Sequence, residues 1–237
     1  MNNVVVRSIS GVVFILAMLA CLMFNKFLFA GLIIFIMSVM LLEFYHITMG
    51  NSYTFSKVLA IIAAICLFGL LFATASYHIP IRFVAFAMVP IFIVMINSLY
   101  VKDKDEYGKF SNIYTGLLYI AVPIALSNLI AFDKAGNFSG NLLLCFFIII
   151  WCSDVGAFAF GISLGKIFPQ KLFPSVSPKK TWIGFIGGLV SSVLAAFALY
   201  EFGILKFPLI HCLILSFIMS VTGVYGDLFE SQWKRVY

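Results

Sequence analysis

The chain has 237 residues, of which 63% are hydrophobic and only 10% are charged, and its mean hydropathy is +1.13. Soluble domains carry about 25% charged residues, so a water-facing surface cannot be built from this composition and a soluble globular protein is excluded. The formal net charge is +6, but the basic residues are scattered between apolar runs, which indicates membrane topology and lipid phosphate rather than nucleic acid.

Eight apolar runs follow one another along the chain, separated by short polar breaks. About 20 residues suffice to cross a bilayer, and in lipid each run must be helical because every backbone N–H and C=O needs an internal partner. The sequence therefore predicts an all-α, polytopic bundle of about eight transmembrane helices, forming a single transmembrane domain over residues 1–237. The predicted spans are residues 9–24, 28–45, 58–76, 83–100, 112–131, 140–162, 182–202 and 207–225.

The charges of the loops set the orientation of these spans. With a cytoplasmic N-terminus, the inside segments carry eleven Lys and Arg residues and the outside loops carry four. Because basic residues are enriched on the cytoplasmic side, the sequence predicts that the N-terminus is cytoplasmic. The inside residues are Arg7, Lys57, Lys102, Lys104, Lys109, Lys166, Lys171, Lys179, Lys180, Lys234 and Arg235, and the outside residues are Lys26, Arg82, Lys134 and Lys206.

Two groups of residues are interpreted as structural. The five cysteines lie inside apolar runs without the CxxC spacing of metal sites, which is typical of reduced packing residues. Three acidic residues, Asp103, Asp105 and Glu106, alternate with lysines in one short segment, and this pattern predicts a solvated loop.

Asp154 is different because it lies inside an apolar run, about 12 Å from the cytoplasmic end of its predicted helix at ~1.5 Å per residue. A carboxylate at this depth costs about 2.5–3.5 kcal/mol unless it faces a polar cavity, a cation or a basic partner. We interpret Asp154 as a candidate site residue, with a hydrogen bond to a neighbouring helix as the structural alternative. The glycines expected to clear this helix and the next for close packing are Gly156, Gly161, Gly165, Gly184, Gly187 and Gly188.

Residues 166–182 form the most polar stretch of the chain. Three prolines and the missing periodicity predict a loop, and four lysines place it in the cytosol by the charge count. The next helix starts after Ser177 and Thr181, so its first backbone N–H groups could join Lys179 and Lys180 in holding phosphate. The alternative is that these lysines only enforce topology and touch lipid headgroups.

The last polar group follows residue 226. On a helix Asp227 shares a face with Glu230 and Ser231 at spacings of three and four, and Glu230 pairs with Lys234 at a spacing of four. Two carboxylates at a helix end are a candidate site for Mg²⁺, which takes oxygen ligands and often bridges to phosphates; a salt-bridged helix end is the alternative. Carboxylates, lysines and helix starts on one side of three successive spans are what metal-assisted phosphoryl or nucleotidyl transfer needs.

These residues resemble, in order and rough spacing, the motifs of bacterial phosphatidate cytidylyltransferases. The string Ser-Pro-Lys-Lys-Thr-Trp is moderately specific alone, and followed by Gly-Asp-Leu-x-Glu-Ser at this distance it is highly specific. The match is strong over roughly residues 140–235, which divides the chain into N-terminal helices (1–139) and a family-like catalytic region (140–237). The matching segments are residues 151–158, 161, 165–166, 177–182, 187–188, 226–231 and 234–235, and residues 7–11 also fit the opening of the family.

The resemblance implies a phospholipid-biosynthesis enzyme that transfers CMP from CTP to phosphatidic acid and gives CDP-diacylglycerol and pyrophosphate. It implies Mg²⁺ as cofactor, membrane lipids around the site, a bacterial inner (cytoplasmic) membrane location and an active side facing the cytoplasm. The glycine-rich faces would suit a homodimer. By carry-over the catalytic residues are Lys179, Lys180 and Asp227, the metal ligands are Asp154, Asp227 and Glu230, and the substrate-binding residues are Ser177, Thr181, Lys166 and Ser231.

The chain departs from the family pattern at two places. Family members usually carry Glu where this chain has Ile183. Their pattern also continues beyond Arg235 through a Lys-Asp pair to a Pro-Gly-His-Gly-Gly segment, an Asp-Arg pair and a further span, whereas this sequence stops at Tyr237. An Asp in the missing part is expected to serve the metal, so we expect the 237-residue chain to be truncated and impaired or inactive as an enzyme.

Three other functions are compatible with the sequence. A related CTP-dependent lipid transferase or kinase would differ only in its lipid substrate. A transporter or channel subunit would place polar residues at mid-membrane in several spans, whereas here the carboxylates gather toward one side. A catalytically inactive homologue would bind lipid or nucleotide without turnover.

Overall fold

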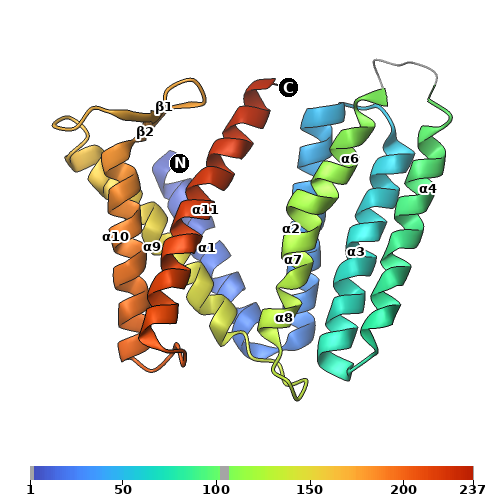
Figure 1. Ribbon diagram of the computed structural model, residues 1–237, viewed down its shortest axis with the longest axis horizontal. Coiled ribbons are helices and arrows are strands. Elements are labelled where there is room, and N and C mark those ends of the chain that lie inside the picture. The colour runs from blue at the N-terminus through green and yellow to red at the C-terminus, as the bar shows by residue number, and fades with distance from the viewer. Residues whose placement is uncertain (1–2, 102–106, 237) are drawn as a thin grey trace. The chain divides into compact units, whose positions relative to one another are not determined.

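Seven helices of the computed structural model are long and apolar enough to cross a membrane (Figure 1). This count refers to residues 3–101 and 107–236, which the structure describes, and the predicted acidic loop at residues 103–106 lies outside them. The all-α, multi-pass architecture is confirmed. The spans are α2 (Lys26–Met49), α3 (Thr54–Tyr77), η1 with α4 (Ile81–Ser98), α6 to α8 (Phe110–Ala131), α9 (Asn141–Ser163), α10 (Trp182–Glu201) and α11 (Leu209–Val236).

The first expected span lies within α1, a helix of 22 residues from Asn3 to Phe24. A single residue, Asn25, separates α1 from α2. Its backbone is extended (φ −154°, ψ 135°) and its side chain accepts a hydrogen bond from the backbone N–H of Phe27 at 2.8 Å. Asn25 therefore ends one helix and caps the next, as short polar side chains do at helix N-termini.

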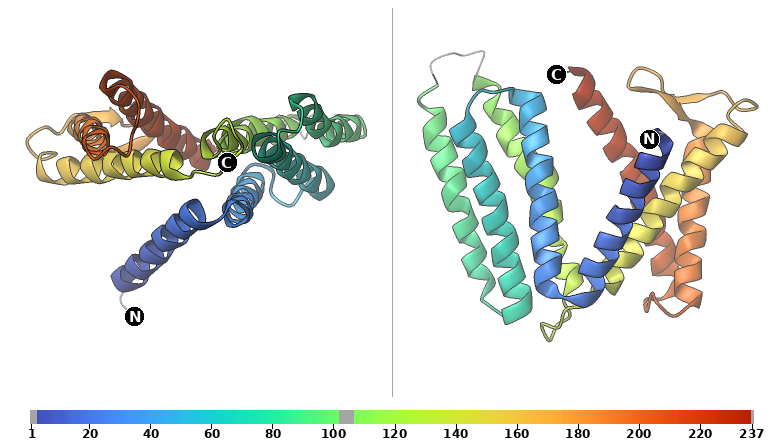
Figure 2. Two further views of the ribbon diagram at one scale, coloured as in Figure 1. Left: turned by 90° about the horizontal axis from the view of Figure 1, so that it is seen from below. Right: turned by 180° about the vertical axis from the view of Figure 1, so that it is seen from behind.

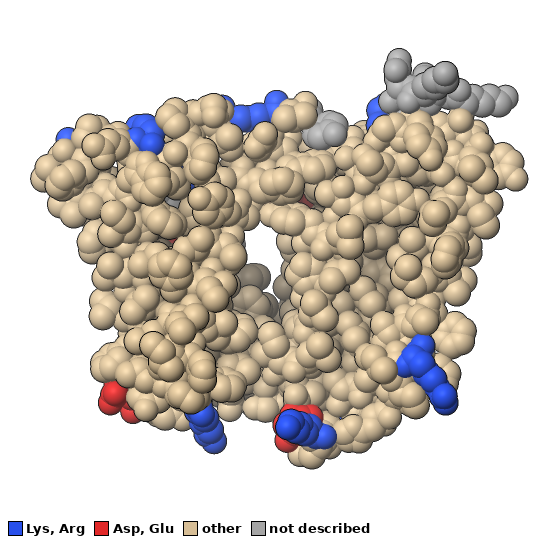
Figure 3. Space-filling view, viewed as in Figure 1, with Lys and Arg blue, Asp and Glu red and all other residues tan. Residues whose placement is uncertain are grey.

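The chain folds into two compact units, Met1–Gly140 and Asn141–Tyr237. In the first unit α2, α3 and α4 lie side by side (Figure 2). Phe29 and Met37 of α2 and Phe68 of α3 are fully buried in its core. On the face drawn in Figure 3 the visible charged side chains lie mainly at the ends of the helices, where they avoid the hydrocarbon.

The predicted span at residues 112–131 is not one regular helix. It consists of α6 (Phe110–Gly116), the π-helix η2 (Leu117–Ala121), α7 (Val122–Leu126) and α8 (Asn128–Ala131). Pro123 has no N–H to donate to the preceding turn, which favours a widened turn just before it. The ring of Tyr45 fills the space beside Gly116, and its hydroxyl donates to the carbonyl of Ile113 at 3.0 Å.

The second unit is built on close packing of α9 against α10. A Cβ atom at Gly156 would lie 2.1 Å from Ser191 Oγ and 2.8 Å from the carbonyl of Gly187. Added Cβ atoms at Gly184 and Gly188 would meet backbone oxygens of α9 at 2.9 Å. The predicted glycine face is confirmed at these positions, and because it is used inside the unit it does not supply a surface for a homodimer.

Gly165 does not belong to this face, because α9 ends at Ser163 and Gly165 lies in the turn that follows. Gly161 lines up with Gly184 across the two helices, although an added Cβ there would meet only ordinary contacts at 3.8–4.0 Å. The expectation of one glycine stripe from residue 156 to 165 is therefore wrong at its C-terminal end, because α9 ends before it reaches Gly165.

The packing predicts that Gly156→Ala destabilises the protein. A methyl group in a packed interface costs about 1–3 kcal/mol, which exceeds the gain in helix propensity of about 1 kcal/mol. The matched control is Gly223→Ala on α11, where an added Cβ meets nothing within 4 Å. Thermal unfolding in detergent should give a lower midpoint for the first variant only; equal midpoints would contradict this interface.

α11 completes the unit by packing on both other helices. Ser153 and Ser220 share a buried hydrogen bond of 2.8 Å between α9 and α11. At the other end Cys145, Ile149, Ala196 and Cys212 belong to one buried apolar cluster. None of the five cysteines forms a disulfide. The prediction that they are packing residues is confirmed for Cys145 and Cys212, which are buried in this cluster, whereas Cys66 is exposed.

Two predictions about this unit are corrected by the structure. Residues 166–182 were expected to form an irregular loop, but they contain a β-hairpin of β1 (Lys171–Phe173) and β2 (Ser177–Thr181). The last span was expected to end near residue 225, but α11 continues to Val236. Its 28 residues span about 42 Å, which is longer than the ~30 Å hydrocarbon core of a bilayer.

Candidate functional site

The hairpin and the start of α10 are joined by short-range hydrogen bonds. Thr181 is the N-cap of α10 and its hydroxyl accepts from the N–H of Gly184 at 3.2 Å. The N–H of Trp182 donates to the carbonyl of Gln170 at 3.1 Å. Two of the helix-start donors expected to hold phosphate therefore already have partners within the chain.

A cavity of about 480 Å³ opens between α9, α10, α11 and the hairpin. Two aspartates and two lysines line it, so their formal charges cancel. Asp154 comes from α9, Lys179 and Lys180 from β2, and Asp227 from α11. The remaining lining residues are Ala157, Phe158, Gly161, Ile162, Leu172, Thr181, Gly184, Phe185, Gly223 and Val224.

Lys180 and Asp227 form a salt bridge across the cavity wall, from the hairpin to α11. The lysine is the more buried partner, with 26% of its side chain exposed against 57% for the aspartate. Asp154 is exposed to the cavity, and the charges of Asp227 and Lys180 both act on it. A phosphate or a cation that binds here would compete for the Lys180–Asp227 pair.

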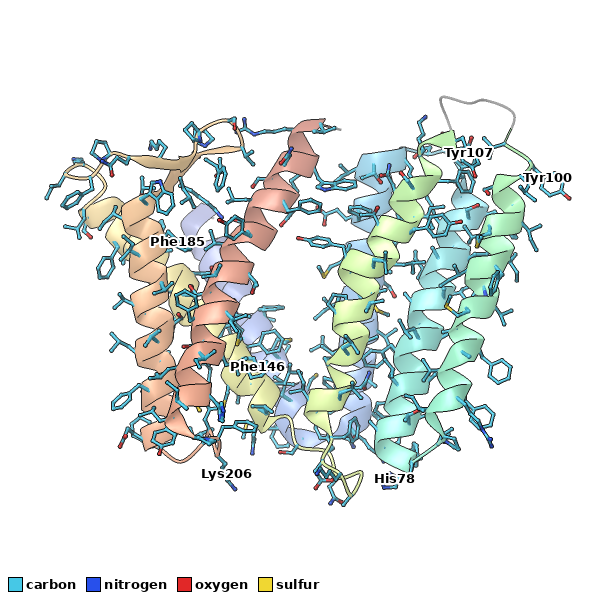
Figure 4. The ribbon with its side chains drawn as sticks, viewed as in Figure 1. His78, Tyr100, Tyr107, Phe146, Phe185 and Lys206 are labelled. Carbon is cyan, nitrogen blue, oxygen red and sulfur yellow. The ribbon has the colours of Figure 1, made fainter. Side chains whose placement is uncertain are left out.

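The rest of the cavity wall is apolar. Phe158 and Ile162 of α9 are 71% and 62% exposed, as residues that face lipid or an open cavity are. Phe185, on the first turn of α10, lies toward the hairpin end of that helix, and Lys206 lies at the opposite end (Figure 4). Glycines at three lining positions leave room between these side chains. The cavity thus offers charged groups and apolar surface to one ligand.

The structure brings Asp154, Lys179, Lys180, Thr181 and Asp227 together around the cavity. The other four predicted site residues are not among its lining residues, and each has a local explanation. Glu230 pairs with Lys234 at 2.5 Å along the exposed side of α11, as the salt-bridge alternative predicted. Ser177 pairs with Phe173 in the hairpin, Lys166 is exposed beyond the end of α9, and Ser231 lies one turn past Asp227.

Sequence reasoning missed the apolar part of the site. Phe158 and Gly161 follow Asp154 at spacings of four and seven, and Gly223 precedes Asp227 by four, so each pair shares a helix face. This spacing could have identified them. Leu172 had no such signal, because it reaches the cavity only through the hairpin.

The chemistry of the site fits a hard divalent cation. Asp154 and Asp227 present carboxylate oxygens to one cavity from neighbouring helices, and Mg²⁺ is commonly bound by one or two carboxylates together with substrate phosphates and water. Within residues 3–101 and 107–236, no cluster of three or more His, Cys, Asp or Glu side chains is suited to a metal. Asp154 and Asp227 are the carboxylates that line the cavity, and Glu230 is not among its lining residues.

The helices and the cavity define an integral membrane protein with a charged site formed by two aspartates and two lysines. Its sequence matches the Cytidylyltransferase family over residues 5–237, and the chain belongs to that family. The region matched includes every residue of the cavity.

Several curated relatives share the name phosphatidate cytidylyltransferase. The Bacillus subtilis protein is 34% identical over 146 residues, which is 61% of this chain and 50% of the relative. The Staphylococcus saprophyticus protein is 39% identical and the Staphylococcus aureus (strain COL) protein 40% identical, each over 95 residues, 40% of this chain and 35% of the relative. The chain thus spans about half, or less, of the length of these relatives.

Proposed function

We propose that this protein transfers CMP from CTP to phosphatidic acid, giving CDP-diacylglycerol and pyrophosphate. The observation that carries the proposal is the single cavity in which Lys179, Lys180, Asp154 and Asp227 lie beside apolar side chains. A nucleotide needs the charged groups and a lipid needs the apolar wall. Family membership and the names of the relatives support the choice of CTP and phosphatidate.

In the proposed reaction a phosphate oxygen of phosphatidic acid attacks the α-phosphorus of CTP. The bond between the α-phosphorus and the bridging oxygen breaks, and pyrophosphate leaves with that oxygen. A phosphate monoester is already anionic near pH 7 because its second pKa is about 6, so no side chain has to remove a proton. The work of the protein is positioning and charge stabilisation.

Lys179 and Lys180 hold the phosphates of CTP in this proposal. Both extend from β2 into the cavity, and a lysine ammonium donates up to three hydrogen bonds to phosphate oxygens. Lys180 would exchange its carboxylate partner, Asp227, for a phosphate. Thr181 shapes the end of the hairpin by capping α10.

Asp154 and Asp227 would hold Mg²⁺. When bound, the ion neutralises negative charge on the phosphates and on the departing pyrophosphate. The apolar wall formed by Phe158, Ile162 and Phe185 would accept the glycerolipid, which reaches the site from the membrane.

The experiment that tests the proposal is conversion of labelled CTP and phosphatidic acid to CDP-diacylglycerol by purified protein. It is run with the 237-residue chain and with a version extended by the C-terminal segment of a relative. Replacing phosphatidic acid with a polyisoprenyl phosphate or an isoprenoid alcohol distinguishes a related lipid transferase or kinase. Formation of CDP-diacylglycerol is the expected result, and its absence from both proteins would contradict the proposal.

The proposed location is the bacterial inner membrane, with the hairpin in the cytoplasm. Supporting this, the second unit carries six basic residues at its hairpin end or on the last turns of α11, and Lys206 lies at the opposite end. We expect Ser175→Cys in the hairpin turn to react with a membrane-impermeant maleimide only in inverted vesicles. The control, Lys206→Cys, should react only in right-side-out vesicles, and the reverse pattern would overturn this orientation.

A further inference from the structure

The hairpin carries the lysines of the site, but it is too small to hold its own position. Its two strands have three and five residues, and the pairing between Lys171–Thr181 and Phe173–Ser177 is irregular. An isolated two-stranded hairpin is at best marginally stable in water. The placement of Lys179 and Lys180 therefore depends on contacts outside the hairpin.

Among the described residues, a salt bridge, an aromatic contact and a hydrogen bond join the hairpin to α11. Beside the salt bridge of Lys180 with Asp227, the rings of Phe173 and Tyr225 meet edge to face with centroids 6.2 Å apart. At the turn, the guanidinium of Arg235 donates a hydrogen bond of 3.0 Å to the backbone carbonyl of Ser175. Sixty residues separate these last two partners in sequence, so the bond links distant parts of the unit.

Only one of the three contacts lies in the cavity. Lys180 and Asp227 line it, whereas Arg235, Phe173 and Tyr225 do not. A phosphate on Lys180 or a cation on Asp227 would break the salt bridge, because each charge would take a new partner. The contacts made by Arg235 and by the aromatic pair would survive that exchange.

We propose that Arg235 is a positioning residue that clamps the hairpin turn to α11 and keeps Lys179 and Lys180 directed at the phosphates of bound CTP. This inference rests on the proposed function for the identity of the ligand. In this proposal Arg235 acts by holding the hairpin in place and does not itself contact the substrate. A role restricted to topology or to lipid headgroups would require only positive charge, without the contact to Ser175.

The test uses the full chain in detergent and the variants Arg235→Gln, Arg235→Lys and Ser175→Ala. Tryptic cleavage after Lys171, followed by mass spectrometry, reports whether the hairpin is held, and titration with CTP and Mg²⁺ reports the Kd. Because Ser175 accepts through its backbone carbonyl, Ser175→Ala should match wild type. Lys206→Gln, at the opposite end of the unit, controls for the lost charge.

For Arg235→Gln we expect faster cleavage after Lys171 and a Kd for CTP raised about three- to tenfold, the scale of a charge-assisted hydrogen bond at an exposed site. Arg235→Lys should recover part of both effects, and all variants should keep the wild-type unfolding midpoint. Unchanged cleavage would overturn the clamp, and faster cleavage with an unchanged Kd would overturn the positioning role. If wild type itself binds no CTP, the proposed function fails, and the cleavage rates still decide whether Arg235 holds the hairpin.

Discussion

Asp227→Asn should lower the rate of CDP-diacylglycerol formation by at least about 100-fold, on the scale of losing one preorganised charge-stabilising group. Asp227 has two roles in the site: it presents a carboxylate to the cavity and it pairs with Lys180. The amide keeps the size of the side chain but removes the negative charge that a divalent cation needs. The measurement is the initial rate with saturating CTP and phosphatidic acid. It uses whichever of the two proteins, the 237-residue chain or the extended version, forms CDP-diacylglycerol.

Glu230 provides the matched comparison for Asp227 on the same helix. It lies three residues further along α11, but it pairs with Lys234 and does not line the cavity. We therefore expect Glu230→Gln to change the rate by less than about threefold, within the range of an exposed i,i+4 pair. Equal losses for the two variants would show that the helix end, and not the cavity, is the site.

Lys180→Gln should also reduce turnover by about 100-fold, and it should raise the KM for CTP more than the KM for phosphatidic acid. The lysine leaves the hairpin next to the cavity, and its ammonium is within reach of the carboxylate that would hold the cation. Without it, one set of phosphate charges loses its partner inside a partly apolar site. Steady-state kinetics with each substrate varied in turn separates the two KM values.

Lys171 supplies the control for this variant because it lies on the same hairpin, carries the same charge and does not line the cavity. Lys171→Gln should leave both KM values within about twofold of wild type, since an exposed charge near the site acts only through screened electrostatics. If Lys171→Gln raised the KM for CTP as much as Lys180→Gln, general attraction of the nucleotide to a basic surface would explain the effect of both variants. A specific phosphate contact would then be excluded.

Much of the fold follows from composition and periodicity. The spans were predictable because lipid leaves the backbone no alternative to helix, and the glycines at 156, 184, 187 and 188 indicated where two helices meet. The interruptions were harder to predict. Pro123 was a local signal for the π-helix that precedes it, but the packing of the Tyr45 ring beside Gly116 is a tertiary contact that no local pattern encodes.

The candidate site was predictable where polar residues stand out from an apolar background, as Asp154 and Asp227 do. Its geometry was less accessible. Prolines in residues 166–182 argued for a loop, but the segment forms a hairpin whose tip is held by Arg235, sixty residues away. Spacing allowed Glu230 to pair either with Asp227 in a metal site or with Lys234 in a salt bridge, and the structure shows the salt bridge.

The most direct test of the central claim is the appearance of label from CTP in CDP-diacylglycerol when the protein is supplied with phosphatidic acid and Mg²⁺. The account predicts lipid-linked CMP and free pyrophosphate in equal amounts, and loss of both in the Asp227→Asn variant. Label that stays in CTP, in the 237-residue chain and in the extended version alike, would contradict the assignment of this cavity to cytidylyl transfer.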